Sequence, residues 1–362
     1  MSKSALVSVV ALGLVLSSGS TFAQGVPGKY RPAIKKALKW VASRQHRDGH
    51  WDSNNQYPVT VTSMCGLALL MEGSTSREGK YSKNIRDAID WMLRRAMPNG
   101  MLGNPNIPGE RGRYMYGHGF ALLFLSCAYG EENNPERRAK MEGVLTRAAK
   151  FSHLAQTSRG GWGYVSARDG SDFDEGSVTI TQVQALRAAR NAGIKVPTKA
   201  IKMAVKYLEA STNSAGGVVY SLASGGAGGS GRPALTAAAI SCGFSAGEYN
   251  SPLVKKWFKF CRERVKGLGG GSRMGHDEYT NYYFSQALYM LGDKGWAKMF
   301  PKDKASDSLS WSKYRKENFP RMISGQRADG SFTGSYVGPE FTTAVYLSIL
   351  QLDNATLPIY QR

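Results

Sequence analysis

The chain has 362 residues, of which 42% are hydrophobic, and its 47 lysines and arginines outnumber 27 aspartates and glutamates, for a formal net charge of +20. The apolar content is sufficient for a large core. The basic residues are scattered without a dense run, which excludes a concentrated basic arm and leaves the charge as a general attraction for anionic partners.

The N-terminus has the pattern of a secretory signal peptide. A basic residue, Lys3, precedes the apolar run 5–16, and the small, polar stretch 17–23 ends in Ala23. The run is too short to span a bilayer, and no later segment is long and apolar enough to do so. We therefore expect cleavage after Ala23 and export to the periplasm or the extracellular medium, with no transmembrane segment in the mature chain.

Amphipathic and apolar helices alternate along the rest of the chain. Segment 31–45 has apolar side chains at helical spacing, with basic ones turned away: Ile34, Leu38 and Val41 against Lys35, Lys36 and Lys39. After a polar turn, 59–73 is apolar nearly all round and ends in glycine. The same pair recurs at 84–130, 141–193, 198–247, 251–292 and 311–352, with turn glycines Gly49, Gly100, Gly160, Gly217, Gly269 and Gly330. Six helical hairpins at a nearly constant interval indicate a repeat architecture.

The spacing Gln-x-x-x-Gly-x-aromatic occurs in three of these turns. The residues are Gln45, Gly49 and Trp51; Gln156, Gly160 and Trp162; and Gln326, Gly330 and Phe332. The glutamine ends the amphipathic helix, where bare carbonyl groups need donors, and the glycine permits a sharp turn. The aromatic ring is expected to cover the glutamine and clamp the turn, so these residues are predicted to be structural.

The pattern predicts an all-α fold, namely an α/α toroid (barrel) of six helical hairpins in two concentric layers. The amphipathic helices would form the outer layer, and the apolar helices would surround a central axis. A closed ring explains why no repeat has a polar cap, which the alternative, an open superhelix of helix pairs, would need. We expect one domain over 30–362, after a short linker at 24–29.

The turn motif in such a barrel resembles the QW motif of squalene–hopene and oxidosqualene cyclases, and the repeats are similar to those of protein prenyltransferase β-subunits. From residue 30 to 362, the chain is similar to the secreted bacterial prenyltransferase and squalene oxidase repeat proteins, through the segments YGHGFALLFLSCAYG, SVTITQVQALRAARNAG and LPIYQR. The resemblance implies the α/α-toroid fold of this superfamily. It implies no single activity, because one fold hosts unrelated chemistries.

In the cyclases that the repeats resemble, an Asp-x-Asp-Asp motif at the start of an inner helix supplies the proton that activates an alkene. The matching place here holds Asp172, Asp174 and Glu175, with glutamate in place of the last aspartate. Clustered and buried carboxyl groups raise one another's pKa, which suits a general acid. The alternative is capping, because acidic residues stabilise helix N-termini. His118 and His276, which open two other inner helices, are further catalytic candidates.

If the barrel closes, all inner helices begin at the same end, and their first residues gather around one mouth. Beside the acidic residues and the histidines, the binding candidates expected there are Arg113, Tyr116, Arg232, Asp277, Tyr279, Tyr282, Tyr283 and Glu340. Six helix N-termini add positive potential. Since pockets form where inner elements start together, we expect one central cavity at this end.

The sequence predicts no cofactor and no metal site. The four cysteines, which are Cys65, Cys127, Cys242 and Cys261, lack zinc-finger spacing, and none has the aspartate two residues before it that prenyltransferase zinc sites contain. Three of them lie in apolar helices, where a free buried thiol is the ordinary outcome, although export would permit disulfides. The glycine-rich stretch 226–231 lacks the βαβ context of a dinucleotide-binding loop.

Three functions remain as hypotheses. The first is an exported toroid protein that binds an apolar or anionic ligand, such as an isoprenoid, another lipid or a peptide, in its central cavity. The second is an isoprenoid (squalene-type) cyclase-like enzyme that uses the acidic cluster. The third is a polysaccharide lyase or hydrolase that acts on acidic glycans. Aromatic walls with few charges would favour the first two, and basic residues around paired carboxylates the third; nucleic acid is not an expected partner of an exported protein.

Overall fold

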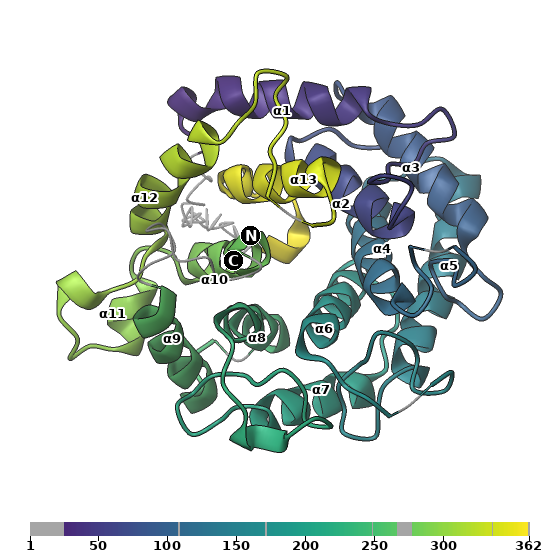
Figure 1. Ribbon diagram of the computed structural model, residues 1–362. Coiled ribbons are helices and arrows are strands. Elements are labelled where there is room, and N and C mark those ends of the chain that lie inside the picture. The colour runs from purple at the N-terminus through teal and green to yellow at the C-terminus, as the bar shows by residue number, and fades with distance from the viewer. Residues whose placement is uncertain are drawn as a thin grey trace, which may run out of the picture.

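The computed structural model describes residues 25–107, 109–170, 172–247, 249–265, 277–334 and 336–360. Its helices form two concentric layers (Figure 1). The outer layer consists of α1 (Arg31–Ser43), α3 (Ser82–Arg95), α5 (Pro135–Leu154), α7 (Thr198–Ala210), α9 (Pro252–Val265) and α12 (Trp311–Ser324). The inner layer consists of α2 (Pro58–Met71), α4 (Tyr114–Tyr129), α6 (Gly176–Asn191), α8 (Pro233–Ala246), α10 (Asp277–Leu291) and α13 (Pro339–Leu350).

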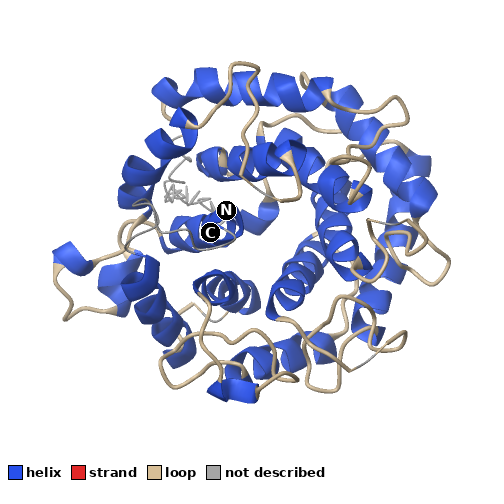
Figure 2. Cartoon of the chain, viewed as in Figure 1, coloured by secondary structure: helices blue, strands red, loops and turns tan. Residues whose placement is uncertain are grey.

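Short elements complete the chain. They are α11 (Gly295–Met299) and the 3-10 turns η1 (Gly28–Tyr30), η2 (Gly226–Gly228), η3 (Ala305–Asp307), η4 (Leu352–Asn354) and η5 (Pro358–Tyr360). The described part of the chain contains no β-strand, as Figure 2 shows. The predicted signal peptide, 1–23, lies outside the described residues.

The inner helices close a ring. Each packs against the next, α2 on α4, α4 on α6, α6 on α8 and α8 on α10, and α13 then bridges α10 and α2. The predicted two-layer α/α toroid is therefore confirmed, and the open superhelix is wrong. Because the ring has no free end, no hairpin has to cover an exposed inner face. Among the described helices, none has both the length and the apolar character that crossing a bilayer requires.

Burial follows the predicted alternation of helices. The outer helix α1 buries a single stripe and exposes its lysines. The inner helix α4 is buried along its whole length except at Tyr116, and α2 except at Thr60. These two exceptions line the central cavity described below. The four cysteines are buried and free.

The glutamines of the repeated motif join neighbouring hairpins. The side-chain amide of Gln45 donates to the carbonyl of Gly49 at 2.8 Å and to that of Asn84, the third residue of the next outer helix, at 2.9 Å. Gln156 and Gln326 make the same pairs of bonds, with Gly160 and Ala200 and with Gly330 and Ala33. The last bond runs from the sixth hairpin to the first. Each glutamine thus donates to a carbonyl of the following outer helix. The prediction that it donates to the carbonyls at the end of its own helix is wrong.

The aromatic residue of the motif lies beneath the turn and is fully buried in all three copies, Trp51, Trp162 and Phe332. The indole N–H of Trp51 donates to the carbonyl of Val41 at 2.7 Å, and that of Trp162 to Ser152 at 2.7 Å. Both acceptors lie in the last turn of the preceding outer helix. The indole therefore supplies the donor that a helix end needs, which is the part predicted for the glutamine.

The turn glycines permit a close approach between outer helices. Gly160 has a φ of +93°, and a Cβ atom there would lie 2.4 Å from the carbonyl oxygen of Met203 in α7. Only glycine combines this backbone angle with this space. In the fourth hairpin the residue in this conformation is Gly216, one position before the predicted Gly217. Gly269, predicted for the fifth turn, lies outside the described residues.

The segment that follows α13 enters the ring. After α13 the chain passes through η4 to η5, which packs against α6 and lies near the centre of Figure 1. Tyr360 is buried, and its hydroxyl donates to Tyr282 of α10. It also lies near Cys127, in the last turn of α4. This segment, which we name the C-terminal plug, therefore fills the interior of the ring beside α6, α10 and the last turn of α4.

Candidate functional site

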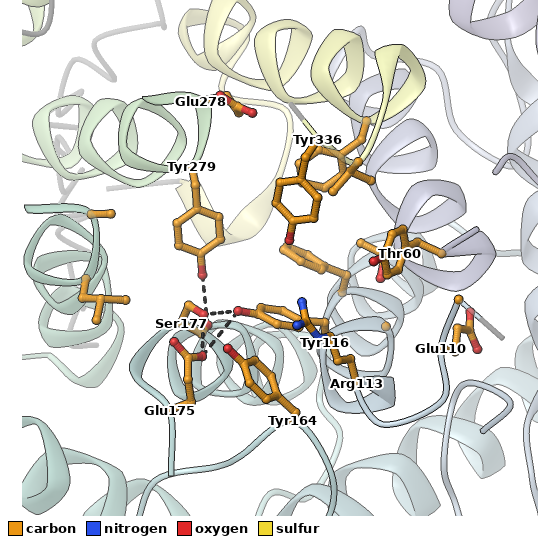
Figure 3. A pocket seen from close by; sticks show the side chains of 18 of the residues that line it. Thr60, Glu110, Arg113, Tyr116, Tyr164, Glu175, Ser177, Glu278, Tyr279 and Tyr336 are labelled. Carbon is orange, nitrogen blue, oxygen red and sulfur yellow. Dashed lines mark hydrogen bonds between the residues drawn. The ribbon is translucent and has the colours of Figure 1, made fainter. Parts of the chain in front are cut away.

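A cavity of about 500 Å³ lies where the six inner helices start (Figure 3). Each inner helix contributes to the wall from its first two turns, through Thr60, Tyr116, Ser177, Ala234, Tyr279 and Phe341 respectively. Eight aromatic side chains line it, which are Tyr57, Tyr116, Phe120, Tyr164, Tyr220, Tyr279, Tyr336 and Phe341. This size and this aromatic lining are typical of a site for a small organic ligand.

Glu175 is the buried acid of the cavity. It is the N-cap of α6, and its Oε2 accepts the backbone N–H of Val178 at 2.9 Å. The hydroxyl groups of Ser177 and, at 3.3 Å, of Tyr116 also donate to Oε2. Burial raises the pKa of the Glu175 carboxyl above its usual range, against the lowering effect of these hydrogen bonds. The carboxyl therefore caps α6, and the direction of its pKa shift is the one that suits a general acid.

A small network surrounds this carboxyl. The Tyr116 hydroxyl is also hydrogen-bonded to the Ser177 hydroxyl, and the Tyr279 hydroxyl donates to the Ser177 carbonyl at 2.9 Å. These residues come from α4, α6 and α10, so three inner helices fix the geometry around Glu175. The hydrogen bonds from the Val178 N–H and from the Ser177 and Tyr116 hydroxyls to the Glu175 carboxyl all fall on Oε2. Oε1 is therefore available to a ligand.

Two arginine–tyrosine pairs frame the start of α6. The guanidinium of Arg113 lies 5.1 Å from the ring centre of Tyr164, and that of Arg232 lies 4.5 Å from Tyr220, which are cation–π distances. The two tyrosine hydroxyls are hydrogen-bonded to each other. Arg113 and Arg232 occupy the matching N-cap positions of α4 and α8, the two neighbours of α6. We name these four residues the rim arch.

Two further carboxylates line the cavity, Glu110 and Glu278. Glu110 is buried and accepts the backbone N–H groups of Val59 at 2.9 Å and of Asn104 at 2.8 Å. It therefore caps the start of α2, and burial raises its pKa. Glu278 stands on α10 beside Tyr279, away from the rim arch (Figure 3).

The structure separates the three acidic residues that were predicted to act together. Only Glu175 lines the cavity. Asp172 is exposed and accepts a backbone N–H of the preceding turn at 2.7 Å. Asp174 is fully buried, and its Oδ1 accepts the hydroxyl of Tyr207 in α7 at 2.9 Å and the N–H of Leu222 at 2.7 Å. Since consecutive side chains of an extended segment point to opposite sides, Asp174 fastens the outer layer while Glu175 faces the cavity.

His118 also points away from the cavity, contrary to its expected place at the mouth. It is fully buried; its Nδ1 accepts the N–H of Leu102 at 3.0 Å, and its Nε2 pairs with the hydroxyl of Ser152 in α5 at 2.9 Å. Burial lowers the pKa of His118 to about 3. The imidazole is therefore a neutral packing residue between the two layers.

The other binding candidates divide into two groups. Arg113, Tyr116, Arg232 and Tyr279 line the cavity as expected. Three candidates do not: Tyr282 and Tyr283 are buried in the core of the ring, and Glu340 bonds to Arg44 and Ser53 of the first hairpin. His276 and the side chain of Asp277 lie outside the described residues.

Sequence reasoning missed the tyrosines that follow the turns. Tyr164 and Tyr220 each end a Gly-Gly-x-x-Tyr stretch, at 160–164 and 216–220. This repetition was a usable signal, because it places the same side chain at the same point of two neighbouring hairpins. Tyr57 and Tyr336 precede α2 and α13 without such a pattern.

No protein-family model and no curated protein matches the sequence. Solved structures match over nearly its whole length. The type II terpene cyclase MstE from Scytonema, in its apo form, is 15% identical, with a TM-score of 0.58 over 91% of this chain and 99% of its own. An inactive variant of an α-1,6-mannanase from Salegentibacter sp., in complex with α-1,6-mannotriose, is 8% identical, with a TM-score of 0.64 over 90% and 99%. The chain has the α/α-toroid fold.

The α/α-toroid fold is shared by proteins with unlike ligands. A variant of MstE has been solved in complex with geranylgeranyl dihydroxybenzoate, its substrate, whereas the mannanase complex contains α-1,6-mannotriose. A protein from Actinoplanes also matches, at 14% identity and a TM-score of 0.55 over 90% of this chain and 99% of its own. The predicted resemblance to terpenoid cyclase-like toroids is thus confirmed for the fold, and the ligand has to be argued from the cavity itself.

Proposed function

We propose that the cavity binds an amphipathic anion, that is, a ligand with an apolar body, such as an isoprenoid or another lipid, and an anionic head. The aromatic wall supports the apolar body, because burial of apolar surface contributes about 25 cal/mol per Å². The rim arch supports the head. In the described part of the chain, neither Arg113 nor Arg232 has a carboxylate within ion-pair distance, so each guanidinium remains available to an anion.

The aromatic wall and the rim arch together favour an amphipathic anion over the two other ligand classes, an acidic glycan and a peptide. A glycan-cleaving enzyme is expected to have paired carboxylates among basic residues, and Asp172 and Asp174, the partners predicted for Glu175, lie outside the cavity. Of the two other carboxylates in the lining, Glu110 accepts the N–H groups of Val59 and Asn104, and Glu278 stands away from the rim arch. A peptide would bring backbone amides that aromatic rings leave unpaired. The N-termini of the six inner helices, all at this end, add positive potential that favours an anionic head.

The first experiment is native mass spectrometry with lipid extraction of the purified chain, which identifies a copurifying ligand. The second is a titration with farnesyl phosphate and with farnesol, which differ only in the head group. Hydrogen bonds to a charged group contribute about 1.5–3 kcal/mol, so we expect the phosphate to bind about 10–100-fold more tightly. This preference should disappear in the double variant Arg113→Gln/Arg232→Gln.

The matched control is Arg111→Gln, because Arg111 is exposed and lies outside the cavity lining. Its affinity for both isoprenoids should equal that of the unaltered chain. Equal binding of farnesol and farnesyl phosphate would contradict the anionic head. Binding of an acidic oligosaccharide in place of both would favour the glycan hypothesis.

A second candidate function is cyclase-like acid catalysis by Glu175. The observation that favours it is the raised pKa of a carboxyl whose Oε1 is available beside aromatic rings, since such a group can deliver a proton to an alkene while the rings stabilise the cation that forms. Glu175→Gln keeps a capping oxygen and should bind the ligand while losing all turnover. Turnover that survives in this variant would remove the candidate.

We further propose that the chain works outside the cytoplasm, after cleavage following Ala23. The support is the signal-peptide pattern of 1–23. N-terminal sequencing of protein recovered from the periplasmic and culture fractions tests this. A mature N-terminus at Gln24 is the expected result, and an intact N-terminus on cytoplasmic protein would contradict it.

A further inference from the structure

The first turn of the ring, 45–52, carries two histidines and an aspartate that meet at one point. The Nε2 atoms of His46 and His50 each lie 3.4 Å from Oδ2 of Asp52. One ligand atom from each residue lies within 4.8 Å of the others. No other group of three histidine, cysteine or acidic side chains in the described ranges comes as close.

A neighbouring carboxylate orients the His50 ring. The Nδ1 of His50 lies 2.5 Å from Oδ1 of Asp48, and Oδ2 of Asp48 accepts the indole N–H of Trp91 at 3.1 Å. The His50 ring also stacks on Trp91, with ring centres 5.1 Å apart. Because a carboxylate only accepts, the contact with Asp48 favours a proton on Nδ1, so a metal ion would bind Nε2, as in the carboxylate–histidine pairs behind metal sites.

The equivalent turn of the sixth hairpin shows which part of this arrangement is common to the repeats. There Asp329 takes the place of Asp48, and its Oδ1 accepts the N–H of Ser331 at 2.9 Å and its hydroxyl at 2.7 Å. Ser331 takes the place of His50, so a donor to the carboxylate belongs to the turn itself. The imidazole is an addition of the first turn, and only that turn also has histidine and aspartate at the other two positions.

We propose that His46, His50 and Asp52 bind a divalent transition-metal ion of the zinc type. Ligands about 2.0–2.1 Å from a tetrahedral ion lie about 3.3–3.4 Å from one another, and both Nε2–Oδ2 distances are 3.4 Å. That spacing is long for a hydrogen bond, which is usually about 2.9 Å. Two imidazoles and one carboxylate, with water in the fourth position, form a common zinc ligand set. The spacing of the cysteines gives no sign of this site, because its ligands are histidine and aspartate.

The ligands differ in how firmly they are held. Asp52 is fixed, because its Oδ1 accepts the N–H of Asn55 at 3.0 Å, which leaves Oδ2 for the ion. The rings of His46 and His50 are almost parallel, at 8°. An ion must lie in the plane of each ring that binds it, so one ring has to tilt. His46 can do so, since 48% of its side chain is exposed.

A metal ion bound by His46, His50 and Asp52 would influence the wall of the central cavity. Between Asp52 and α2, the residues Asn54, Asn55 and Tyr57 have φ angles of +54°, +60° and +53°, a region that residues other than glycine rarely adopt. Tyr57 lines the cavity. An ion on Asp52 would tether the start of this strained loop to the rigid first turn.

The sixth turn supplies matched variants for the test. H50S installs the residue of the sixth turn, which keeps the contact with Asp48, and H46R likewise copies Arg327. Calorimetric titration with ZnCl₂ uses the chain without a histidine tag, after treatment with EDTA, and Co²⁺ absorption reports the ligand field. We expect one Zn²⁺ per chain, and binding at least about tenfold weaker in each variant, with unchanged melting temperatures in EDTA.

Two results would overturn the proposal. One is the absence of stoichiometric Zn²⁺ binding by the unaltered chain, and the other is equal Zn²⁺ affinity in the H46R/H50S double variant. In either case the cluster is a pair of histidine–aspartate ion pairs. If H50S does not fold, H46R carries the test, because its position is half-exposed. This proposal does not depend on the ligand of the central cavity, so each can fail alone.

Discussion

Removal of the Trp162 indole tests whether the turn aromatics hold the two layers together. The side chain is fully buried, and its N–H is the hydrogen-bond donor for the Ser152 carbonyl at 2.7 Å. Trp162→Ala leaves a large cavity and should lower the free energy of unfolding by about 3–5 kcal/mol. Trp162→Phe keeps most of the apolar volume, as Phe332 does in the sixth turn, but leaves the carbonyl without its donor, which costs about 1–3 kcal/mol.

Urea denaturation followed by far-UV circular dichroism gives the change in the free energy of unfolding for both variants, provided that its slope against urea concentration is unchanged. The free energy of unfolding should decrease in the order unaltered chain, Trp162→Phe, Trp162→Ala. Midpoints equal to that of the unaltered chain in both variants would show that the ring contributes no stability. Equal losses for phenylalanine and alanine would assign the whole effect to the hydrogen bond and none to the packing.

Three further predictions concern the turns and the core. Burial lowers the pKa of His118 in the folded chain to about 3, below its ordinary 6.5, so the unfolded chain binds more protons between these pH values. The free energy of unfolding should therefore fall as the pH decreases from 6.5 toward 3. Urea midpoints measured across this range should fall less in His118→Asn. Gly160→Ala should destabilise the chain by more than about 1 kcal/mol. Gly143→Ala, inside α5, where an added Cβ would meet only the flexible end of Arg147 at 3.5 Å, should stabilise it by about 0.5–1 kcal/mol in a thermal melt. Gln326→Ala removes two hydrogen bonds and should cost about 1–3 kcal/mol in urea.

The layers of the fold could be predicted from the sequence because burial differs so strongly between them. The stripe on α1 and the apolar surface of α4 require one helix outside and the other inside. Details of the turns could not be predicted. Trp51, and not Gln45, donates a hydrogen bond to the end of α1. Gln45 donates instead to Asn84 of the next hairpin, a neighbour that no local spacing in the sequence reveals.

The cavity was predicted at the right end of the ring, but half of its expected side chains face elsewhere. His118 shows the reason, because a helix that is apolar on all sides gives no sign of which face turns inward. The separation of Asp174 from Glu175 follows from the alternation of an extended segment, yet the sequence does not show which of the two faces the cavity. Arg113 and Arg232 were predictable because N-cap positions of inner helices all lie at the mouth.

The position of the C-terminal plug has a consequence for how the chain is made. The ribosome releases the hairpins one after another, and the inner faces of α2 and α10 remain uncovered until α13 arrives between them. The segment up to Tyr360 then has to enter the ring after α13 has been made. Folding during synthesis would therefore leave an incomplete, apolar horseshoe that is prone to aggregation. Chains that stop before α13 should therefore expose the inner faces of α2 and α10 and form no closed ring.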